Sequence, residues 1–166
     1  MTCSFERMAV ESNKLRLRPA HAEELDELSG LCLRSKSVWG YDAVSLEACR
    51  AELSLHPDDL AGDNVWVADR GGAIVGIVQI STSGTVASLE KLFIEPSAMR
   101  CGLGRRLFEW AARKARALGA REMVIESDPG AADFYRRMGA RDEGFAMSGS
   151  IPGRRLPRLK LELEED

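Results

Sequence analysis

The sequence predicts a single-domain α/β protein (α+β in some schemes) with a mixed, largely antiparallel sheet of about six to seven strands and helices on both faces. Three observations predict this fold. The chain has 166 residues, which suits one domain with a sizeable core. Short β-rich runs alternate with stretches of helical periodicity. Three strand-like runs also follow one another through tight turns before a long amphipathic helix, which favours antiparallel pairing.

The composition is that of a globular protein with no evident affinity for nucleic acid or membrane. Hydrophobic residues make up 45% of the chain and charged residues 30%, and the formal net charge is -3. This acidic balance does not favour nucleic acid and leaves room for a cationic substrate. No apolar run approaches the length that spans a bilayer. We therefore expect neither nucleic acid nor membrane as a partner.

The N-terminal residues and the cysteines bear on processing and location. Residues 1–13 lack the apolar core of a signal peptide, and we expect a loosely ordered arm there, before a domain that spans residues 14–166. Met8 is an alternative start to Met1. The cysteines show neither CxxC pairing nor a companion histidine at metal-ligand spacing. This predicts a reduced, cytoplasmic protein without structural zinc, and the four residues concerned are Cys3, Cys32, Cys49 and Cys101.

Periodicity and turn residues place the elements along the chain. Two-residue alternation predicts strands, whereas leucines and alanines at helical spacing predict helices. Ser45 is a candidate N-cap for the second helix, and Asp128 and Pro129 suit the N-cap and first position of the last one. The expected strands are residues 14–18, 65–69, 73–82, 86–94, 123–126, 143–148 and 156–163, and the expected helices are 22–35, 45–55, 103–118 and 129–138.

One stretch, residues 89–119, combines a strand, a glycine loop and the longest predicted helix. Pro96 ends the strand, Gly102 and Gly104 lie in the loop, and apolar residues then recur at helical spacing as far as Gly119. Backbone N–H groups and the positive end of the helix dipole converge at such a loop, where glycine lets a ligand approach closely. The stretch therefore predicts an anion site that suits a pyrophosphate.

Two other phosphate-binding patterns do not fit this loop. A Walker loop needs Gly-Lys-Ser/Thr, but Arg105 and Arg106 follow Gly104. A dinucleotide fingerprint needs a third glycine where Leu107 stands, and here three antiparallel-looking strands precede the loop. Glu126 could still supply the acidic residue of that fingerprint. A nucleotide-binding protein is therefore kept as the lesser alternative.

Two blocks of sequence resemble motifs of the GNAT superfamily of N-acetyltransferases. EPSAMRCGLGRRLFEWA is similar to its acetyl-CoA signature, Gln/Arg-x-x-Gly-x-Gly/Ala at the start of a helix, with Met99 at the Gln/Arg position. DPGAADFYRRMGA, residues 128–140, resembles a second motif, in which Asp128 replaces the usual Asn. The two blocks stand in the family's order and spacing. The residues that match the motifs are Gly102, Gly104, Ala131, Phe134, Tyr135 and Gly139.

The resemblance implies an acyltransferase that uses acetyl-CoA as its cosubstrate and needs no metal. It implies that the strands at 89–94 and 123–126 splay apart, so that pantetheine lies between them. The phosphates would be held mostly by backbone N–H groups of the glycine loop. The cofactor-binding residues expected on this basis are Leu92, Phe93, Ile94, Arg100, Cys101, Gly102, Leu103, Gly104, Arg105, Asp128 and Phe134.

The resemblance also implies the chemistry, in which a primary amine attacks the thioester directly and a tetrahedral intermediate forms. Tyr135 matches the tyrosine that protonates the departing thiolate. Glu90, or a water it holds, is the candidate base, because several family members use a glutamate on this strand. Its alternative role is a solvated strand charge. Glu126 and Asp128 are rival bases, although Asp128 is most simply a helix cap.

Two segments are expected to shape the acceptor site. Trp39 and Tyr41 follow the first helix, and they either line that site or, in the case of Trp39, plug the core. Residues 148–157 are polar and rich in turn formers, and Ser148 and Arg154 in this segment are candidate substrate contacts. Arg154 and its neighbour Arg155 could pair with an acceptor carboxylate, and the alternative is a solvated loop.

The expected acceptor is a small-molecule amine or an amine on a protein. Many relatives form homodimers, but no interface pattern is readable in this sequence. The main alternative to an enzyme is a non-catalytic acyl-CoA-binding sensor, because Met99 and Asp128 depart from the motifs.

Overall fold

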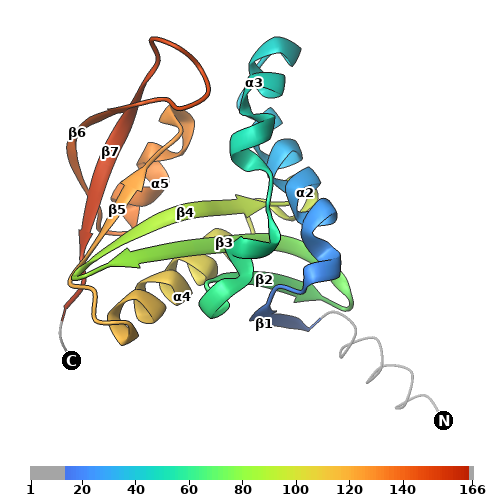
Figure 1. Ribbon diagram of the computed structural model, residues 1–166, viewed down its shortest axis with the longest axis horizontal. Coiled ribbons are helices and arrows are strands. Elements are labelled where there is room, and N and C mark those ends of the chain that lie inside the picture. Colours follow the sequence, from blue (N-terminus) through green and yellow to red (C-terminus); the bar gives the residue numbers. More distant parts are fainter. Residues whose placement is uncertain (1–13, 165–166) are drawn as a thin grey trace.

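The computed structural model describes residues 14–164, and the expected arm at residues 1–13 lies outside the described residues. Seven strands form one sheet, and helices pack on both of its faces (Figure 1). Short 3₁₀ turns precede two of the helices. The strands are β1 (Leu15–Pro19), β2 (Val65–Arg70), β3 (Ala73–Ser83), β4 (Val86–Ile94), β5 (Glu122–Glu126), β6 (Arg141–Met147) and β7 (Arg155–Glu162), and the helices are α2 (Leu25–Ser37), α3 (Ala43–Leu53), α4 (Leu103–Ala117) and α5 (Ala132–Arg137).

The sheet is mixed but mostly antiparallel, as the sequence predicts. Its strand order is β1-β2-β3-β4-β5-β7-β6, so the last strand of the chain lies between β5 and β6. Only the pair β4–β5 is parallel, and α4 supplies the crossover between these two strands. The other pairs are antiparallel. The parallel pair therefore divides the sheet into two antiparallel halves.

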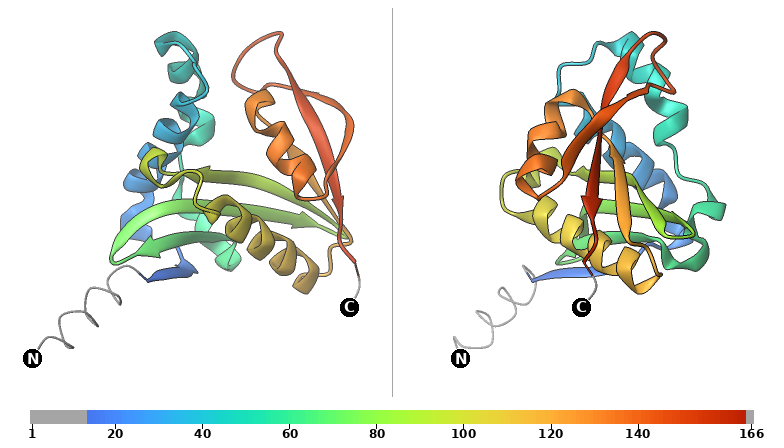
Figure 2. Two further views of the ribbon diagram at one scale, coloured as in Figure 1. Left: turned by 180° about the vertical axis from the view of Figure 1, so that it is seen from behind. Right: turned by 90° about the vertical axis from the view of Figure 1, so that its left-hand side faces the viewer.

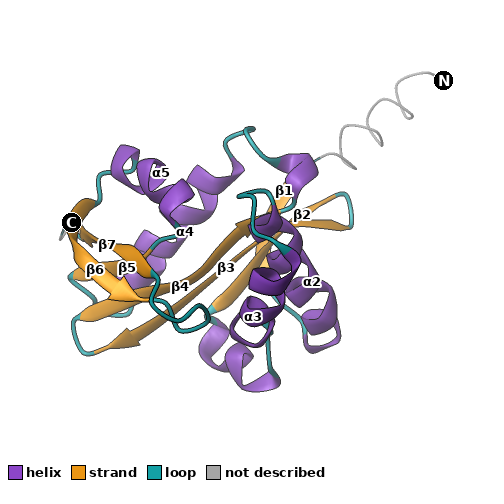
Figure 3. Cartoon of the chain, turned by 90° about the horizontal axis from the view of Figure 1, so that it is seen from above, coloured by secondary structure: helices purple, strands orange, loops and turns teal. Residues whose placement is uncertain are grey.

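Two pairs of helices cover the two faces of the sheet. Figure 2 shows α4 crossing the sheet on one side, and Figure 3 shows α2 and α3 on the face opposite α4 and α5. The predicted apolar stripe of α4 is buried against the sheet through Leu103, Leu107, Trp110, Ala111 and Ala115. A second apolar cluster lies under α2 and α3, where Leu28, Leu31, Cys32 and Cys49 pack on Val67 and Ile77.

A glycine in β3 sets how closely α4 approaches the sheet. A Cβ added at Gly76 would lie 2.9 Å from Cδ1 of Leu107 and 3.3 Å from Cδ1 of Ile94. Real Cβ atoms are almost never this close to another heavy atom, so only glycine fits here. This contact holds the N-terminal half of α4 beside the end of β4, where the site described below is found.

A β-bulge separates β4 from β5. Leu89 pairs with Ile80 and Lys91 pairs with Gln79, which leaves Glu90 as the extra residue. Pairing between β4 and β5 covers only residues 86–89 of β4. A bulge bends its strand and increases the local twist, so β4 turns away from β5 beyond this point. The predicted splay is present and is visible in Figure 1.

Two helix starts refine the expectations from sequence. The N-cap of α3 is Asp42 and not Ser45, because Oδ1 of Asp42 accepts a hydrogen bond from the Ser45 N–H at 2.7 Å. Asp128 caps the 3₁₀ turn that starts with Pro129, as predicted, and α5 itself begins at Ala132. Both corrections move a helix boundary by a few residues and leave the order of elements unchanged.

Candidate active site

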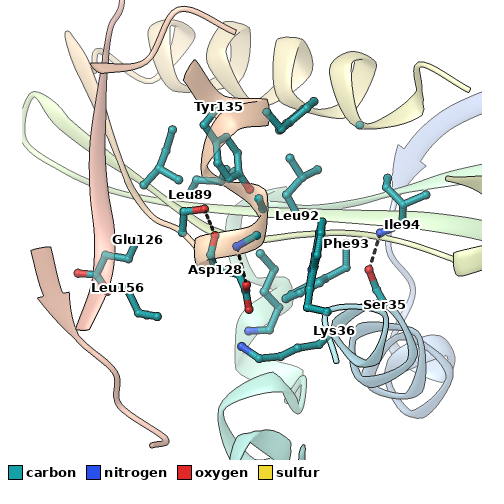
Figure 4. Close-up of a pocket in the computed structure, with 18 of the residues that line it drawn as sticks. Ser35, Lys36, Leu89, Leu92, Phe93, Ile94, Glu126, Asp128, Tyr135 and Leu156 are labelled. Atoms are coloured by element: carbon teal, nitrogen blue, oxygen red, sulfur yellow. Dashed lines mark hydrogen bonds between the residues drawn. The ribbon is translucent and has the colours of Figure 1, made fainter. Parts of the chain in front are cut away.

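A cleft of about 930 Å³ opens where β4 and β5 separate. Its walls come from α2, the loop after it, β4, the glycine loop, the end of β5, α5 and the β6–β7 loop (Figure 4). Two of the predicted site residues, Cys101 and Leu103, do not line it. The structure brings all the others to this one cleft, namely Trp39, Tyr41, Glu90, Leu92, Phe93, Ile94, Arg100, Gly102, Gly104, Arg105, Asp128, Phe134, Tyr135, Ser148 and Arg154.

The glycine loop presents the uncapped N-terminus of α4. Gly102 is the N-cap, with φ of 79°, and no side chain caps the helix there. The N–H groups of the first turn of a helix have no partner within the helix, so they are available to an anion. A Cβ on Gly102 would meet nothing within 4 Å, whereas one on Gly104 would lie 3.4 Å from Cζ of Phe134. The loop is therefore open on one side and covered by Phe134 on the other.

The two predicted residues outside the cleft have other surroundings. Leu103 is 2% exposed and belongs to the core, so it offers only its backbone N–H to a ligand. The Sγ of Cys101 donates to the carbonyl of Ala98 at 2.6 Å. Cys101 is exposed and Cys32 and Cys49 are buried, and all three are free thiols. Cys3 lies outside the described residues.

The register of β4 determines which backbone groups face the cleft. The N–H of Glu95 donates to the carbonyl of Val75 at 2.9 Å. The backbone N–H and C=O groups of successive residues point to opposite edges of a strand, so those of Phe93 also face β3. The N–H and C=O groups of Leu92 and Ile94 therefore face the cleft. The Ile94 N–H donates to Oγ of Ser35 at 3.2 Å, which agrees with this orientation (Figure 4).

Tyr135 points its hydroxyl into the cleft from α5 (Figure 4). The residue is 8% exposed, and its ring packs 5.1 Å from Phe134 and 5.8 Å from Phe108, measured between ring centroids. Its hydroxyl makes no hydrogen bond to any residue in the described part of the chain. Burial, and then the negative charge of Asp128, raise the pKa of Tyr135 well above its usual value. The phenol therefore stays protonated at neutral pH.

The three candidate bases occupy different places. Glu90 is exposed at the bulge, and its Oε1 accepts from the Ser81 hydroxyl at 2.6 Å. Glu126 is exposed at the end of β5, across the cleft from Lys36 (Figure 4). Asp128 uses Oδ1 to accept from the Gly130 N–H at 3.1 Å, which is the capping role that the sequence predicts.

The loop after α2 reaches across the cleft to the turn before α5. The Tyr41 hydroxyl donates to Oδ2 of Asp128, and the indole of Trp39 lies against Gly130. A Cβ on Gly130 would lie only 2.6 Å from Cε3 of Trp39. Trp39 is 48% exposed, so it does not plug the core. Of the two roles considered for this residue, the structure shows it in the wall of the cleft.

The β6–β7 loop closes another part of the same wall. The Ser150 hydroxyl donates to Glu52 of α3, and the guanidinium carbon of Arg154 lies 4.6 Å from the ring centroid of Tyr41. The Ser148 hydroxyl accepts from the backbone N–H groups of Ser150 and Ile151 and so shapes the loop. The segment is therefore packed against α3 and Tyr41 and is not a freely solvated loop.

Several cleft residues were not identified from sequence. They lie on regular elements, where serine, lysine and leucine are ordinary residues, and no local pattern distinguishes them. The last turn of α2 directly precedes the predicted aromatic loop, and Lys91 follows Glu90. Nearness in sequence to predicted site residues is therefore the only signal that points to these additional cleft residues. The residues concerned are Ser35, Lys36, Glu52, Lys91, Ser127 and Leu156.

Within residues 14–164, no group of three or more histidine, cysteine, aspartate or glutamate side chains is arranged to hold a metal ion. No helix in this range has both the length and the apolar character to cross a membrane.

Comparison with known proteins gives the family. The model of the acetyltransferase (GNAT) domain matches residues 20–147. The chain is 34% identical over 92 residues to the IAA acetyltransferase of Azospirillum brasilense, a match that covers 52% of this chain and 60% of that protein. It is 27% identical over 124 residues to the peptidyl-lysine N-acetyltransferase YiaC of Escherichia coli K12, covering 74% of this chain and 81% of the relative. The chain thus spans less than two thirds of the Azospirillum protein.

Solved structures share the fold at low sequence identity. The PaiA N-acetyltransferase of Thermoplasma acidophilum, in complex with coenzyme A, superposes with a TM-score of 0.74 at 15% identity, covering 90% of this chain and 99% of that one. A GCN5-related N-acetyltransferase from Rhodopseudomonas palustris superposes with a TM-score of 0.71 at 19% identity, covering 89% of this chain and 95% of that one. Because the family model matches most of the chain and the cleft lies where the sequence motifs predict it, this protein belongs to the GNAT family of acetyltransferases.

Proposed function

We propose that this protein transfers the acetyl group of acetyl-CoA to the nitrogen of a primary amine. The observation that carries the proposal is the separation of β4 from β5 after Leu89, with the uncapped N-terminus of α4 beside the cleft and the Tyr135 hydroxyl inside it. Membership of the family supports it. So does the coenzyme A complex of the Thermoplasma protein, which has the same fold.

The residues of the cleft fit acetyl-CoA. The pyrophosphate would bind to backbone N–H groups between Arg100 and Arg105, where Gly102 leaves the approach open. Pantetheine would pair with the backbone of Leu92 and Ile94, which faces the cleft. Ser35 would then have to release the Ile94 N–H. Acetyl-CoA supplies an activated thioester, and the protein supplies binding, orientation and proton transfer.

Each proton in the reaction has an assigned group. A lysine-like amine has a pKa of about 10, so it must lose a proton before it attacks. Glu90, or a water it holds, takes that proton, and the neutral nitrogen then forms the new C–N bond. A cleft-facing N–H of β4 stabilises the negative charge on the carbonyl oxygen. The C–S bond then breaks, and Tyr135 donates its proton to the departing thiolate, which leaves as free coenzyme A. As the amide forms, the nitrogen gives up its second surplus proton, which restores the Tyr135 phenol directly or through water.

The test is transfer from acetyl-CoA to a panel of primary amines, followed by thiol release and by the mass of the product. Transfer that depends on the amine supports the enzyme. Tight coenzyme A binding without turnover of any amine would support the sensor instead, a role that the departures at Met99 and Asp128 permit. Thermal stabilisation by NAD or ATP but not by coenzyme A would favour a nucleotide-binding protein.

Two matched variants identify the base. We expect Glu90→Gln to lower kcat/KM about a hundredfold near neutral pH. The loss should shrink at high pH, because the amine then loses its proton to solvent. The variant Glu126→Gln removes an exposed carboxylate at the end of β5 that also lines the cleft, and it serves as the comparison. If Glu126→Gln shows this pH-dependent loss and Glu90→Gln does not, the base is Glu126.

The acceptor amine belongs to a small molecule or to a protein. The Escherichia coli relative is a peptidyl-lysine N-acetyltransferase, which supports including peptides in the panel. Free amino acids and small amines belong in the panel as well.

A further inference from the structure

Two basic side chains from different elements of the cleft wall approach the ring of Tyr41. Nζ of Lys36, in the last turn of α2, is 5.2 Å from the ring centroid. The guanidinium carbon of Arg154, in the β6–β7 loop, is 4.6 Å from the same point. Both side chains are partly buried and line the cleft. Two positive charges therefore lie near the same aromatic ring.

Neither charge has an ion-pair partner among residues 14–164. Two carboxylates in the wall of the cleft already accept hydrogen bonds from other groups. Asp128 accepts from the Tyr41 hydroxyl with one oxygen and from the Gly130 N–H with the other. Glu52 accepts from the Ser150 hydroxyl. A partly buried cation gains from a carboxylate ligand, because the pairing offsets the cost of its partial desolvation.

A third basic residue adds to the positive character of this side of the cleft. Nζ of Lys91 donates to Oε1 of Gln79 at 3.2 Å, and Nε2 of Gln79 donates to Oδ1 of Asp59 at 3.1 Å. The amide of Gln79 therefore bridges Lys91 and Asp59, and it holds the ammonium group of Lys91 in the wall of the cleft.

This positive cluster is distinct from the proposed phosphate site. The glycine loop has its own basic residues, Arg100 and Arg105, of which Arg105 pairs with Glu109 at 3.1 Å. The cluster does not follow from overall composition either, because the chain as a whole carries a net charge of -3. An anionic group other than the cofactor phosphates is therefore the natural ligand of Lys36 and Arg154.

We infer that the acceptor is an amine that also carries a carboxylate, such as an amino acid, and that Lys36 and Arg154 bind this carboxylate. Arg154 can do so with two parallel N–H donors, which fixes the acceptor's orientation. The rest of the cleft, which the Tyr135 hydroxyl enters from α5, remains for the amine (Figure 4). The inference rests on the proposed acetyl transfer and names the class of acceptor for the same cleft.

The experiment compares α- and ω-amino acids with their own carboxamides, which keep the primary amine and lose the negative charge. We expect kcat/KM to be about tenfold or more higher for the acids. Arg154→Gln and Lys36→Gln should each bring this acid-to-amide ratio closer to one. Arg155→Gln is the matched control, because Arg155 is exposed and its guanidinium lies over Phe145, outside the cleft. It should leave the ratio unchanged.

A binding measurement separates this inference from the proposed function. With coenzyme A present, acids should raise the thermal midpoint of the wild-type protein more than their amides do, and Arg154→Gln should remove the difference. Equal use and equal binding of acids and amides would overturn the inference while acetyl transfer stands. Preference for a peptide lysine without a nearby carboxylate would overturn it too. If no amine is acetylated, the proposed function fails, and the binding comparison still decides whether the cleft recognises carboxylates.

Discussion

The hydroxyl of Tyr41 donates a hydrogen bond to the carboxylate of Asp128 and so joins the loop after α2 to the turn before α5. The two residues are 87 positions apart in the sequence. Burial, and then the hydrogen bond to Asp128, raise the pKa of Tyr41, so its phenol stays a donor at neutral pH. This contact closes one wall of the cleft and connects the two antiparallel halves of the fold.

Replacing Tyr41 by Phe removes that hydrogen bond and keeps most of the ring packing. We expect the free energy of unfolding to fall by about 1 kcal/mol, and the KM for the acceptor to rise more than the Kd for coenzyme A. Urea denaturation, steady-state kinetics and coenzyme A titration measure the three quantities. Asp128→Asn is the comparison, because an asparagine can both cap the turn and accept from Tyr41. An unchanged acceptor KM in Tyr41→Phe would show that this wall does not contact the acceptor.

A methyl group at Gly130 should displace Trp39. The added Cβ would lie 2.6 Å from Cε3 of the indole, which is too close for the ring to keep its place. We expect a change in tryptophan fluorescence and a higher KM for the acceptor. Gly149→Ala is the control in the same wall, because its Cβ would lie 3.5 Å from the flexible carboxylate of Glu52. If Gly130→Ala leaves the fluorescence unchanged, Trp39 does not rest on Gly130 in solution.

The order of elements was predictable because its signals are local. The hairpin of β2 and β3 and the apolar stripe of α4 are predicted by neighbouring residues, and the structure confirms both. The glycine loop and the block from residue 128 to 140 carried the family resemblance, and the family match agrees with it. Helix boundaries were less predictable, since Asp42 and Ser45 both have the chemistry of an N-cap.

The walls of the cleft were not predictable in the same way. The contacts of Tyr41 with Asp128 and of Glu52 with Ser150 join residues far apart in sequence, so no local pattern reveals them. The bulge at Glu90 depends on the pairing of β4 with β3. The sequence does not show that Lys36 and Arg154 lie against the same aromatic ring, because only folding brings them together. Sequence reasoning found many of the residues but not how they are paired.

The role of the glycine loop in coenzyme A binding can be tested with two glycines of positive φ at opposite ends of α4. Gly102 has φ of 79° and Gly119 has φ of 93°, and a Cβ at either would meet nothing within 4 Å. Alanine at either position should cost about 1 kcal/mol of stability through backbone strain. Only Gly102→Ala should also weaken coenzyme A binding, as measured by titration. Equal coenzyme A affinity in both variants would place the phosphates elsewhere.

A cluster of ion pairs around Arg18 of β1, an edge strand of the sheet, should make the free energy of unfolding depend on pH. Arg18 binds Glu24 at 2.7 Å and Asp69 at 3.0 Å, with all three side chains largely buried. The hydrogen bond from Arg18 lowers the pKa of Glu24 below its ordinary value of 4.5. A lowered pKa in the folded state contributes stability above the unfolded pKa, and this stability is lost as the pH falls through the folded pKa.

We therefore expect Arg18→Gln to lower the free energy of unfolding by about 2 kcal/mol at pH 7. The difference from wild type should shrink as the pH falls below the ordinary glutamate pKa of 4.5 and then through the lowered pKa of Glu24, because the carboxylate takes up a proton. Urea denaturation between pH 3 and 7 measures it, with Arg113→Gln, at an exposed position of α4, as control. A difference that stays constant over this range would mean that the ion pair does not stabilise the fold.

The most direct test of the central claim is the rate of acetyl transfer in Tyr135→Phe. Phenylalanine keeps the packing against Phe108 and Phe134 and removes only the hydroxyl that points into the cleft. We predict a fall in kcat of about a hundredfold, with coenzyme A affinity within about threefold of wild type. Because the pKa of Tyr135 is raised, wild-type kcat should show no alkaline decline up to about pH 10. A variant that transfers acetyl groups at the wild-type rate would contradict the role of this cleft in catalysis.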